Sequence, residues 1–296
     1  MNKLPLVSII IPSYNHKQFL RECLDSIFNN GYENIQVVVI DDNSTDGSKE
    51  VLRKLKNKYP FDLVIKEESK GLVDSLNLFL KKHCKGDYYK PVSSDDIIIK
   101  GSIAKTIKEF QQNVNIDVII GAAIGIDENS NKIKEYPVKC KGSLSYKNFL
   151  LGNITYNITA TFYRTRIHKL IGMYQEGVVS EDIYFSRSIW KNLNIHIVDY
   201  YISGYRTHNT NTSKDSWLMY QESLKALKAL EGDEFYELKK RREYLNFFAS
   251  LSKNHKKEAF KYLMPSLRFW NDKLFLIGIV NLLGITRLVK KLVKQE

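Results

Sequence analysis

Apolar runs with the period of a β-strand alternate with segments of helical period throughout the first hundred residues. Buried strands are predicted over residues 7–11, 35–40, 61–66 and 88–92, and helices over residues 16–28, 47–58 and 71–82. Strands that alternate with helices pair in parallel, because each helix returns the chain to the same end of the sheet. The pattern therefore predicts an α/β fold, with a mostly parallel sheet flanked by helices.

The alternation becomes looser after residue 101. Helices are predicted over residues 103–110, 144–151 and 181–191, extended segments over residues 117–126, 158–163 and 195–206, and a polar loop over residues 127–134. No linker separates these elements from the first hundred residues, so we expect them to extend the same sheet. We predict one α/β domain over residues 1–215, with halves that meet near residue 100, and a helical C-terminal extension over residues 216–296.

The composition narrows the class of protein. A chain of 296 residues, 43% of them hydrophobic, is long enough to bury a large core. The three cysteines, Cys23, Cys84 and Cys140, are scattered, which argues against a disulfide scaffold or a zinc cluster. The apolar run at residues 7–11 is too short for a signal peptide, and Asn281 interrupts the longest apolar stretch. We therefore expect a cytoplasmic protein with no membrane-spanning segment.

Positive charge is concentrated in the last fifth of the chain. The formal net charge is +12, and residues 239–296 contribute +10 of it, with 14 Lys and Arg against 4 Asp and Glu. A near-neutral body with a basic tail favours contact with an anionic surface, either phospholipid or nucleic acid. The alternative is a lysine-rich helix face that meets only water.

Polar clusters follow three of the predicted strands, at the points where those strands end. They are residues 12–15 (PSYN), 41–46 (DDNSTD) and 93–96 (SSDD). The carboxyl ends of parallel strands meet at one edge of a sheet, where α/β proteins bind ligands. Carboxylates there can accept hydrogen bonds from a nucleoside or hold Mg²⁺ or Mn²⁺ beside a diphosphate. One such cluster is more often a turn, but three at one edge favour a nucleotide site.

In this order, the segments resemble the signature of the family 2 glycosyltransferases, which have the GT-A fold. The resemblance rests on residues 7–15 (VSIIIPSYN), residues 39–47 (VIDDNSTDG), Lys70 and Gly71 with Asn77, and residues 93–96, and it extends over about residues 5–215. It implies an inverting, hexosyltransferase-type enzyme that takes a sugar from a nucleotide-diphosphate sugar. A UDP-sugar is the expected donor.

The resemblance also implies where the donor and a divalent ion bind. Its donor-binding positions correspond to Pro12, Tyr14, Asn15, Asp41, Asp42, Ser44, Lys70, Ser93, Ser94 and Arg206. Asp95 and His208 are the expected ligands of Mn²⁺ or Mg²⁺. The chain departs from the family's DXD motif at Ser93, which stands where the first aspartate is usual. We therefore expect a weaker hold on the metal.

Residues 180–187 (SEDIYFSR) resemble the family's ED motif on the acceptor side of the site. Inverting transfer needs a carboxylate that takes the proton of the acceptor hydroxyl as this attacks the anomeric carbon. The resemblance assigns this role to Asp182 and assigns the orientation of the acceptor to Glu181. Without the resemblance, two acidic residues at the start of a helix are more simply favourable partners of the helix dipole.

Residues 205–208 (YRTH), followed by Ser213, resemble the family's element after the last core strand. Within it, Arg206 is expected to neutralise charge that develops on the diphosphate, and His208 either to complete the metal shell or to donate to the diphosphate.

Two other functions remain open at this stage. A nucleotidyltransferase uses a similar sheet, but it typically has a Gly-rich basic loop that residues 12–15 do not provide. A nucleic-acid-binding protein could use the aromatic and basic residues around 269–275, although the acidic sheet edge would repel phosphate. We therefore expect no nucleic-acid partner.

An amphipathic helix is predicted between Asp272 and Gln295. Its apolar face comprises Ile285, Leu288, Val289, Leu292 and Val293, and its basic face Arg287, Lys290, Lys291 and Lys294. Such a helix is typical of a membrane interface. The expected location is therefore the inner face of the cell membrane, with a glycan or a polyprenyl-diphosphate-linked saccharide of bacterial surface polysaccharide synthesis as acceptor. The competing interpretation is that the helix packs on the α/β body or on a second subunit.

Overall fold

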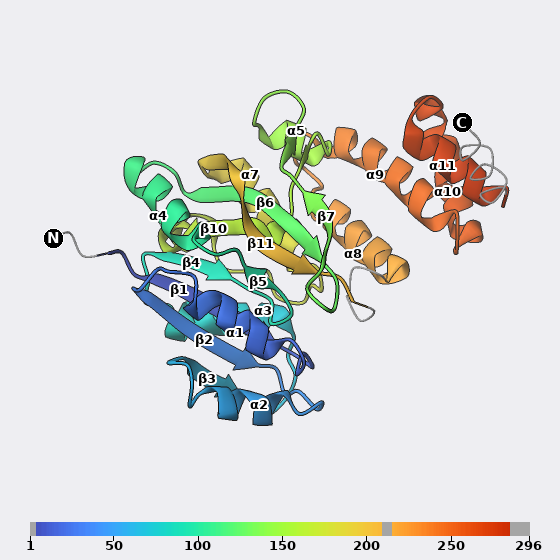
Figure 1. The fold of residues 1–296 in the computed structure, drawn as a ribbon. Helices are drawn as coiled ribbons and strands as arrows, with labels where there is room; N and C mark the ends of the chain where they lie inside the picture. The colour runs from blue at the N-terminus through green and yellow to red at the C-terminus, as the bar shows by residue number, and fades with distance from the viewer. Residues whose placement is uncertain (1–3, 209–214, 285–296) are drawn as a thin grey trace. The chain divides into compact units, whose positions relative to one another are not determined.

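The computed structural model describes residues 4–208 and 215–284 (Figure 1). The chain divides into two compact units, Met1–Asn209 and Thr210–Glu296. The first is an α/β unit and the second is helical.

Within residues 4–208, nine strands form one sheet in the order β3-β2-β1-β4-β10-β6-β11-β5, with β7 paired to β6. The strands are β1 (Val7–Ser13), β2 (Ile35–Asp41), β3 (Asp62–Ile65), β4 (Tyr88–Pro91), β5 (Ile97–Ile98), β6 (Val118–Ile126), β7 (Lys132–Tyr136), β10 (Thr161–Arg164) and β11 (Ile195–Arg206). Strands β1 to β4 pair in parallel, β10 runs antiparallel to β4 and β6, and β11 is parallel to β6. The predicted fold class is confirmed.

Helices cover both faces of this sheet. They are α1 (Leu20–Phe28), α2 (Ser48–Leu55), α3 (Leu72–Leu78), α4 (Ser102–Gln112), α5 (Tyr146–Leu150), α6 (His168–Ile171) and α7 (Glu181–Asn192). Ile9 and Ile11 of β1 pack in the layer that contains α1, α2 and α4, whereas Ile10 packs in the layer that contains α3 and α7. Because both faces are buried, the strand is apolar without alternation, as the sequence indicates.

Two segments differ from the sequence-based expectation. The predicted polar loop over 127–134 ends early, because β7 pairs antiparallel with β6 and the two strands form a hairpin. Four of the five β7 side chains are exposed, so the strand lacks an apolar signal. The predicted strand over 158–163 begins with a 3₁₀ turn, Ile158–Ala160, which the Asn157 side chain caps by accepting from the backbone N–H of Thr159 at 3.0 Å. A small second sheet pairs β8 (Lys139–Cys140) with β9 (Ile154–Thr155).

The C-terminal unit contains α8 (Ser216–Lys228), α9 (Tyr236–Leu251), α10 (Lys256–Ser266), a 3₁₀ turn (Leu267–Phe269) and α11 (Lys273–Leu282). The helical nature of this region agrees with its sequence pattern. Phe275 of α11 is buried, and a Cβ atom added at Gly278 would lie 2.4 Å from the ring of Phe248 in α9. The first half of the predicted amphipathic helix therefore packs on α9. Its stripe over residues 285–293, like Ser213, lies outside the described residues.

Across residues 4–208 and 215–284, no helix combines the length and the apolar character needed to cross a bilayer.

Candidate functional site

The loops after β1 and β2 hold one another at the carboxyl edge of the sheet. Asn15 adopts a left-handed conformation (φ 55°), its backbone N–H donates to Ser44 Oγ at 2.9 Å, and its side-chain oxygen accepts from Thr45 N at 2.8 Å. The fully buried Asp41 accepts from Ser44 N and Ser44 Oγ at 2.9 and 2.7 Å. These residues set the shape of the edge, and the half-exposed Tyr14 ring lies beside them in sequence.

Asp42 organises the next part of this edge. It accepts hydrogen bonds from Lys66 Nζ and Ser69 Oγ, both at 2.6 Å, and from the backbone N–H groups of Lys70 and Gly71 at 3.0 and 2.8 Å. Burial opposes ionisation, but these hydrogen bonds outweigh it and lower the pKa of Asp42. The sequence did not single out Lys66. Lys70 contributes its backbone here, while its exposed ammonium group pairs with a surface glutamate.

A cluster of two imidazoles and one carboxylate lies at the end of β4. His208 Nε2 is 2.8 Å from Asp95 Oδ2, and His16 Nδ1 is 3.6 Å from Asp95 Oδ1. One potential ligand atom of each residue lies within 4.8 Å of the other two. Asp95 and His208 were predicted from the sequence as metal ligands, but His16 was not, although it directly follows the motif at residues 7–15. Two predicted ligand residues are too few for a metal site, and this shortage is the signal that could have pointed to His16 as a third ligand.

These three residues fit a divalent ion. Asp95 Oδ1 is buried and has no hydrogen-bond partner among the described residues, which is unusual for a carboxylate oxygen and leaves one ligand position open. Burial lowers the pKa of His16, which favours the neutral imidazole that metal binding requires. Mg²⁺ prefers an all-oxygen shell, whereas later transition metals accept imidazole nitrogen more readily. The donor set therefore fits Mn²⁺ better than Mg²⁺.

Arg206 corrects an expectation. Its side chain is fully buried, and it pairs with Glu22 Oε2 at 2.7 Å and donates to the Asp95 carbonyl at 2.6 Å. It also donates to the Asp127 carbonyl and to Ser130 Oγ, both at 2.9 Å. A guanidinium group engaged on all sides is not available to a diphosphate. Its role in the structure is to tie the metal-ligand loop to α1 and to the β6–β7 hairpin.

A buried lysine supports the floor of the site. Lys90 of β4 donates to the carbonyl oxygens of Thr159 and Thr161, at 2.5 and 3.4 Å. Burial lowers the pKa of Lys90 to about 7, against the opposing charge of Asp96. The lysine thereby holds the 3₁₀ turn that carries Ile158 and Thr159, two residues that line the adjacent cavity.

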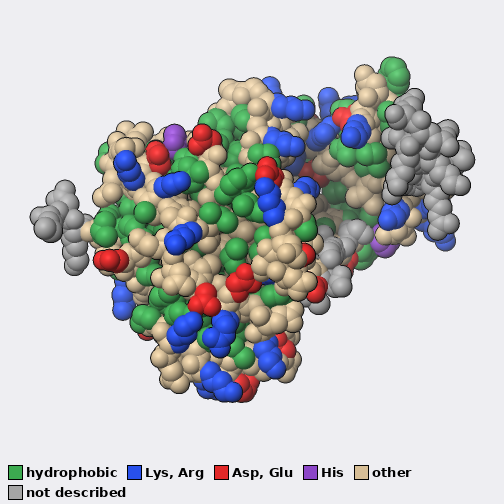
Figure 2. All heavy atoms as spheres, viewed as in Figure 1, with side chains coloured by type: hydrophobic (Ala, Val, Ile, Leu, Met, Phe, Trp, Pro, Cys, Tyr) green, Lys and Arg blue, Asp and Glu red, His purple; other side chains and the backbone are tan. Residues whose placement is uncertain are grey.

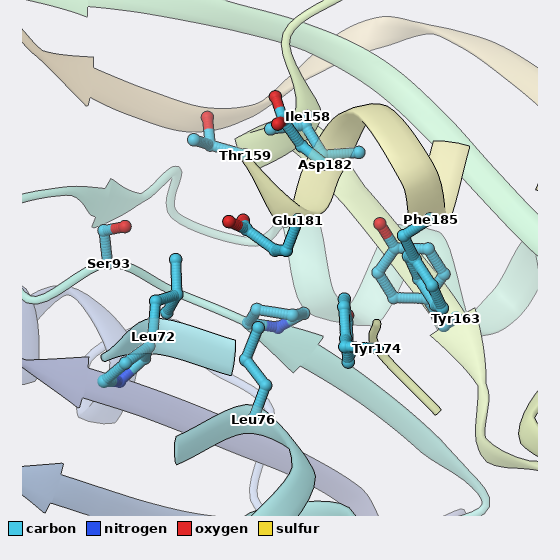
Figure 3. Close-up of a pocket in the computed structure, with 12 residues that line it drawn as sticks. Leu72, Leu76, Ser93, Ile158, Thr159, Tyr163, Tyr174, Glu181, Asp182 and Phe185 are labelled. Carbon is cyan, nitrogen blue, oxygen red and sulfur yellow. The ribbon is translucent and has the colours of Figure 1, made fainter. Parts of the chain in front are cut away.

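Figure 3 shows that cavity, which lies between the end of β4, α3 and the start of α7. Glu181 projects toward Ser93, and Asp182 lies beside Ile158 and Thr159. Burial and the neighbouring Asp182 raise the pKa of Glu181 to about 8, and burial also raises the pKa of Asp182. Pro12 is a further lining residue. Ser94 points elsewhere, with its hydroxyl group 2.8 Å from His16 Nδ1.

The start of α7 is held by a clamp from α3. Asn77 donates to the Tyr174 carbonyl at 3.0 Å and accepts from the Tyr174 backbone N–H at 3.1 Å. The Tyr174 ring stacks on Phe185 of α7, with 4.1 Å between ring centroids, and lines the cavity. The segment before the two carboxylates is therefore fixed to the half of the sheet that contains β1 and β4.

Comparisons with known proteins agree with this arrangement. A family model described as glycosyl transferase family 2 matches residues 8–208. The glycosyltransferase GlyG of Streptococcus pneumoniae is 31% identical over 131 residues, which cover 44% of this chain and 43% of GlyG. The minor teichoic acid biosynthesis protein GgaB of Bacillus subtilis is 31% identical over 115 residues, or 38% of this chain and 13% of GgaB. The aligned part is thus less than half of each relative.

Solved structures share the fold at low sequence identity. Residues 1–349 of Staphylococcus aureus TarS, in complex with UDP-GlcNAc, match with a TM-score of 0.62 at 18% identity, over 88% of this chain and 81% of that one. The mannosyltransferase PcManGT of Pyrobaculum calidifontis, in complex with GDP-Man and Mn²⁺, matches with a TM-score of 0.61 at 14% identity, over 96% and 89% of the two chains.

Proposed function

From the premise that this chain belongs to glycosyl transferase family 2, we propose that it transfers a sugar, with inversion, from a UDP-sugar to a hydroxyl group. The proposed acceptor is a glycan or a polyprenyl-diphosphate-linked saccharide. The observation that carries the proposal is the double role of residues 93–96. Ser93 lines the cavity that contains Glu181 and Asp182, and Asp95 meets His16 and His208.

The donor half of the proposal rests on the carboxyl edge of β1, β2 and β4. In this proposal Pro12, Tyr14 and Asp42 contact the nucleoside, and their support is that the loops after β1 and β2 are fixed by Asp41 and Ser44. His16, Asp95 and His208 would hold Mn²⁺, which supplies positive charge opposite a departing diphosphate. The neighbouring proteins crystallised with UDP-GlcNAc or with GDP-Man and Mn²⁺ support a nucleotide-sugar donor.

The acceptor half rests on the two carboxyl groups at the start of α7. With a pKa of about 8, Glu181 holds its proton at neutral pH, and it can donate a hydrogen bond to an acceptor oxygen. Asp182 is then the group that takes the proton of the attacking hydroxyl. The proton passes from the hydroxyl oxygen to an Asp182 oxygen as this hydroxyl oxygen bonds to the anomeric carbon, while the bond from that carbon to the diphosphate oxygen breaks and UDP leaves with its electron pair. Glu181 positions the acceptor during this step.

Product stereochemistry tests this function. The full chain is incubated with UDP-GlcNAc, Mn²⁺ and a panel of saccharide acceptors, and the anomeric proton of the product is followed by NMR. We expect a β-linked product from the α-linked donor, and a water-derived β-sugar when no acceptor is present. A product that keeps the α configuration would contradict inversion, and turnover without UDP release would contradict glycosyl transfer.

The location proposed for this enzyme is the cytoplasmic face of the membrane, where a polyprenyl-linked acceptor is found. Support comes from the basic C-terminal unit. Figure 2 shows Lys and Arg side chains with few acidic neighbours on the visible face of this unit, whereas the two charges alternate over the α/β unit. An excess of cations attracts anionic lipid at about 1 kcal/mol for each residue near the surface.

A further inference from the structure

Four large apolar side chains are exposed along one side of α10 and the turn that follows it. Phe260, Met264, Leu267 and Trp270 have exposed fractions of 57, 71, 45 and 68%. Their spacing of four, three and three residues places them in one row on a helix. We call this row the α10 stripe.

The α10 stripe is not needed to build the helical core. The core side of α10 is formed by Ala259, Tyr262 and Ser266, which are all buried. Ala259 and Tyr262 belong to the same apolar cluster as Leu245, Phe247, Phe248 and Leu251 of α9. The side of α10 next to the stripe therefore supplies the core contacts of this helix, and the stripe itself is not part of the core. Four neighbouring large apolar groups on a surface mark an interaction site.

Basic residues border the α10 stripe on its other side. Lys257 and Lys261 lie one turn apart on α10, next to the stripe, and Arg268 follows them in the 3₁₀ turn Leu267–Phe269. The acidic neighbour of this row is Glu258, which pairs with Lys261 at 2.7 Å and accepts from Tyr220 OH at 2.8 Å. A row of apolar groups beside a row of cations, ending in a tryptophan, is complementary to the headgroup region of an anionic bilayer.

We propose that the α10 stripe, with Lys257, Lys261 and Arg268 at its edge, is the surface through which the enzyme lies on an anionic membrane. This inference rests on the proposed function and specifies the part of the chain that makes the contact. It differs from the sequence-based expectation, which favoured residues 272–295. Phe275 and Gly278 of α11 face α9, and Leu276, Ile277 and Leu283 are exposed on or just after α11. Within residues 215–284, the α10 stripe has more large exposed apolar side chains than α11, and two of them are aromatic.

Vesicle sedimentation of the full chain tests the proposal. The vesicles contain phosphatidylcholine alone or phosphatidylcholine with about 30% phosphatidylglycerol, at low and at physiological salt. We expect the natural chain to bind only the mixed vesicles. In Met264→Gln/Trp270→Gln, which we call the α10 variant, the affinity for these vesicles should fall by at least about 10-fold, because the two side chains supply the apolar contact. Lys257→Gln/Arg268→Gln should lose the preference for phosphatidylglycerol.

Two matched controls make the result decisive. Val114→Gln removes an equally exposed apolar side chain from the α/β unit and should bind vesicles like the natural chain. Leu288→Gln/Leu292→Gln changes the tail that the sequence favoured and should also retain binding. Loss of binding in this tail variant, with normal binding by the α10 variant, would overturn the proposal.

Activity and oligomeric state separate the remaining outcomes. Release of UDP from UDP-GlcNAc in the absence of vesicles should be equal in the natural chain and the α10 variant. If UDP release persists but no vesicle binds, the membrane proposal fails while the proposed function stands. If the α10 variant turns a dimer into a monomer without a change in vesicle binding, the stripe is an interface between two copies, which also overturns the proposal.

Discussion

The two units of this chain use charged residues in opposite ways. The α/β unit buries several charged side chains in specific hydrogen bonds, as Asp41, Asp42 and Arg206 illustrate. In the described part of the helical unit, charged side chains are mostly exposed, and most of their ion pairs join residues one helical turn apart, as between Lys261 and Glu258. The pair of Arg242 with Asp272 is the exception there. The energy of a buried charge depends on the particular atoms that contact it, whereas exposed charges contribute little one by one and act mainly through their combined charge. Substitutions should therefore have residue-specific effects in the first unit and small, additive ones in the second.

The largest expected effect follows from Arg206→Met. This change removes the guanidinium group from Glu22 and from the carbonyl oxygens of Asp95 and Asp127. We expect a loss of about 3 kcal/mol in the free energy of unfolding, because the carbonyl oxygens of Asp95 and Asp127 lose a charged hydrogen-bond donor, whereas the half-exposed Glu22 can be solvated by water. Urea denaturation at constant protein concentration measures it. A loss below about 1 kcal/mol would mean that the buried network contributes no more than a surface pair.

The next effect is catalytic. Asp182→Asn keeps the shape of the side chain but cannot accept a proton, so we expect kcat to fall by at least about 100-fold. UDP-GlcNAc binding in the presence of Mn²⁺, measured by calorimetry, should stay within about twofold of the natural chain. Near-normal turnover would move the general base to another residue. Glu181→Gln, tested in the same assay, distinguishes a base from a group that orients the acceptor.

A smaller effect is expected at the proposed metal ligands. Asp95→Ala and His16→Ala should each weaken Mn²⁺-dependent UDP binding by about 10-fold or more, whereas Ser93→Ala should change it far less. Calorimetry with and without Mn²⁺ gives both affinities for every variant. Equal affinity in the natural chain and in Asp95→Ala would reject the cluster as a metal site. If only His16→Ala had no effect, the site would be reduced to Asp95 and His208.

The fourth expectation concerns pH and stability. The pKa of Glu181 is raised to about 8 in the folded chain, above the value near 4.5 of the unfolded one. The folded state therefore holds more protons between these values, and the contribution of Glu181 to stability is full below pH 4.5 and is lost as pH rises toward 8. The Tm of Glu181→Gln relative to the natural chain should rise from pH 5 to pH 8. A difference that does not change with pH would place this pKa near its usual value.

The smallest effect is expected for an exposed charge of the helical unit. Lys257→Gln removes an exposed charge in the helical unit, for which we expect a change within about 0.5 kcal/mol in the free energy of unfolding. Denaturation under the conditions used for Arg206→Met measures both. A change above 1 kcal/mol would show that the surface of this unit also contains charges with specific structural roles.

The sequence predicted the donor half of the fold better than the acceptor half. Strands such as β1 and β2 are buried on both faces, so their apolar runs are uninterrupted and easy to recognise. The exposed strand β7 has no such run, and its pairing with β6 depends on tertiary structure. The helical unit was recognisable from its period, but which of its apolar faces packs on α9 was not.

The candidate site shows the same limit at the level of single residues. Asp95 and His208 were expected together because both fall in recognisable segments, and the structure brings them to 2.8 Å. His16 lies in the turn after the first motif, and only the folded chain reveals its distance from Asp95. Arg206 was assigned to the donor from its position beside His208. Its side chain points into the protein. The polar and apolar residues around it do not alternate regularly, so the sequence does not show which way this side chain points.

Strand β5 has a consequence for the order in which the protein is made. The loop with Asp95 lies between β4 and β5, and Ile97 and Ile98 pair only with Gly204 and Ser203 of β11 within the described sheet. The chain must therefore grow by more than a hundred residues after Asp95 before β5 has its strand partner, although Ser26 and Asn30 already bind Ile98 and Ile99 through hydrogen bonds. A nascent chain on the ribosome has the loops after β1 and β2 long before His208 can reach Asp95. Synthesis thus separates in time two parts of a site that the folded protein holds side by side.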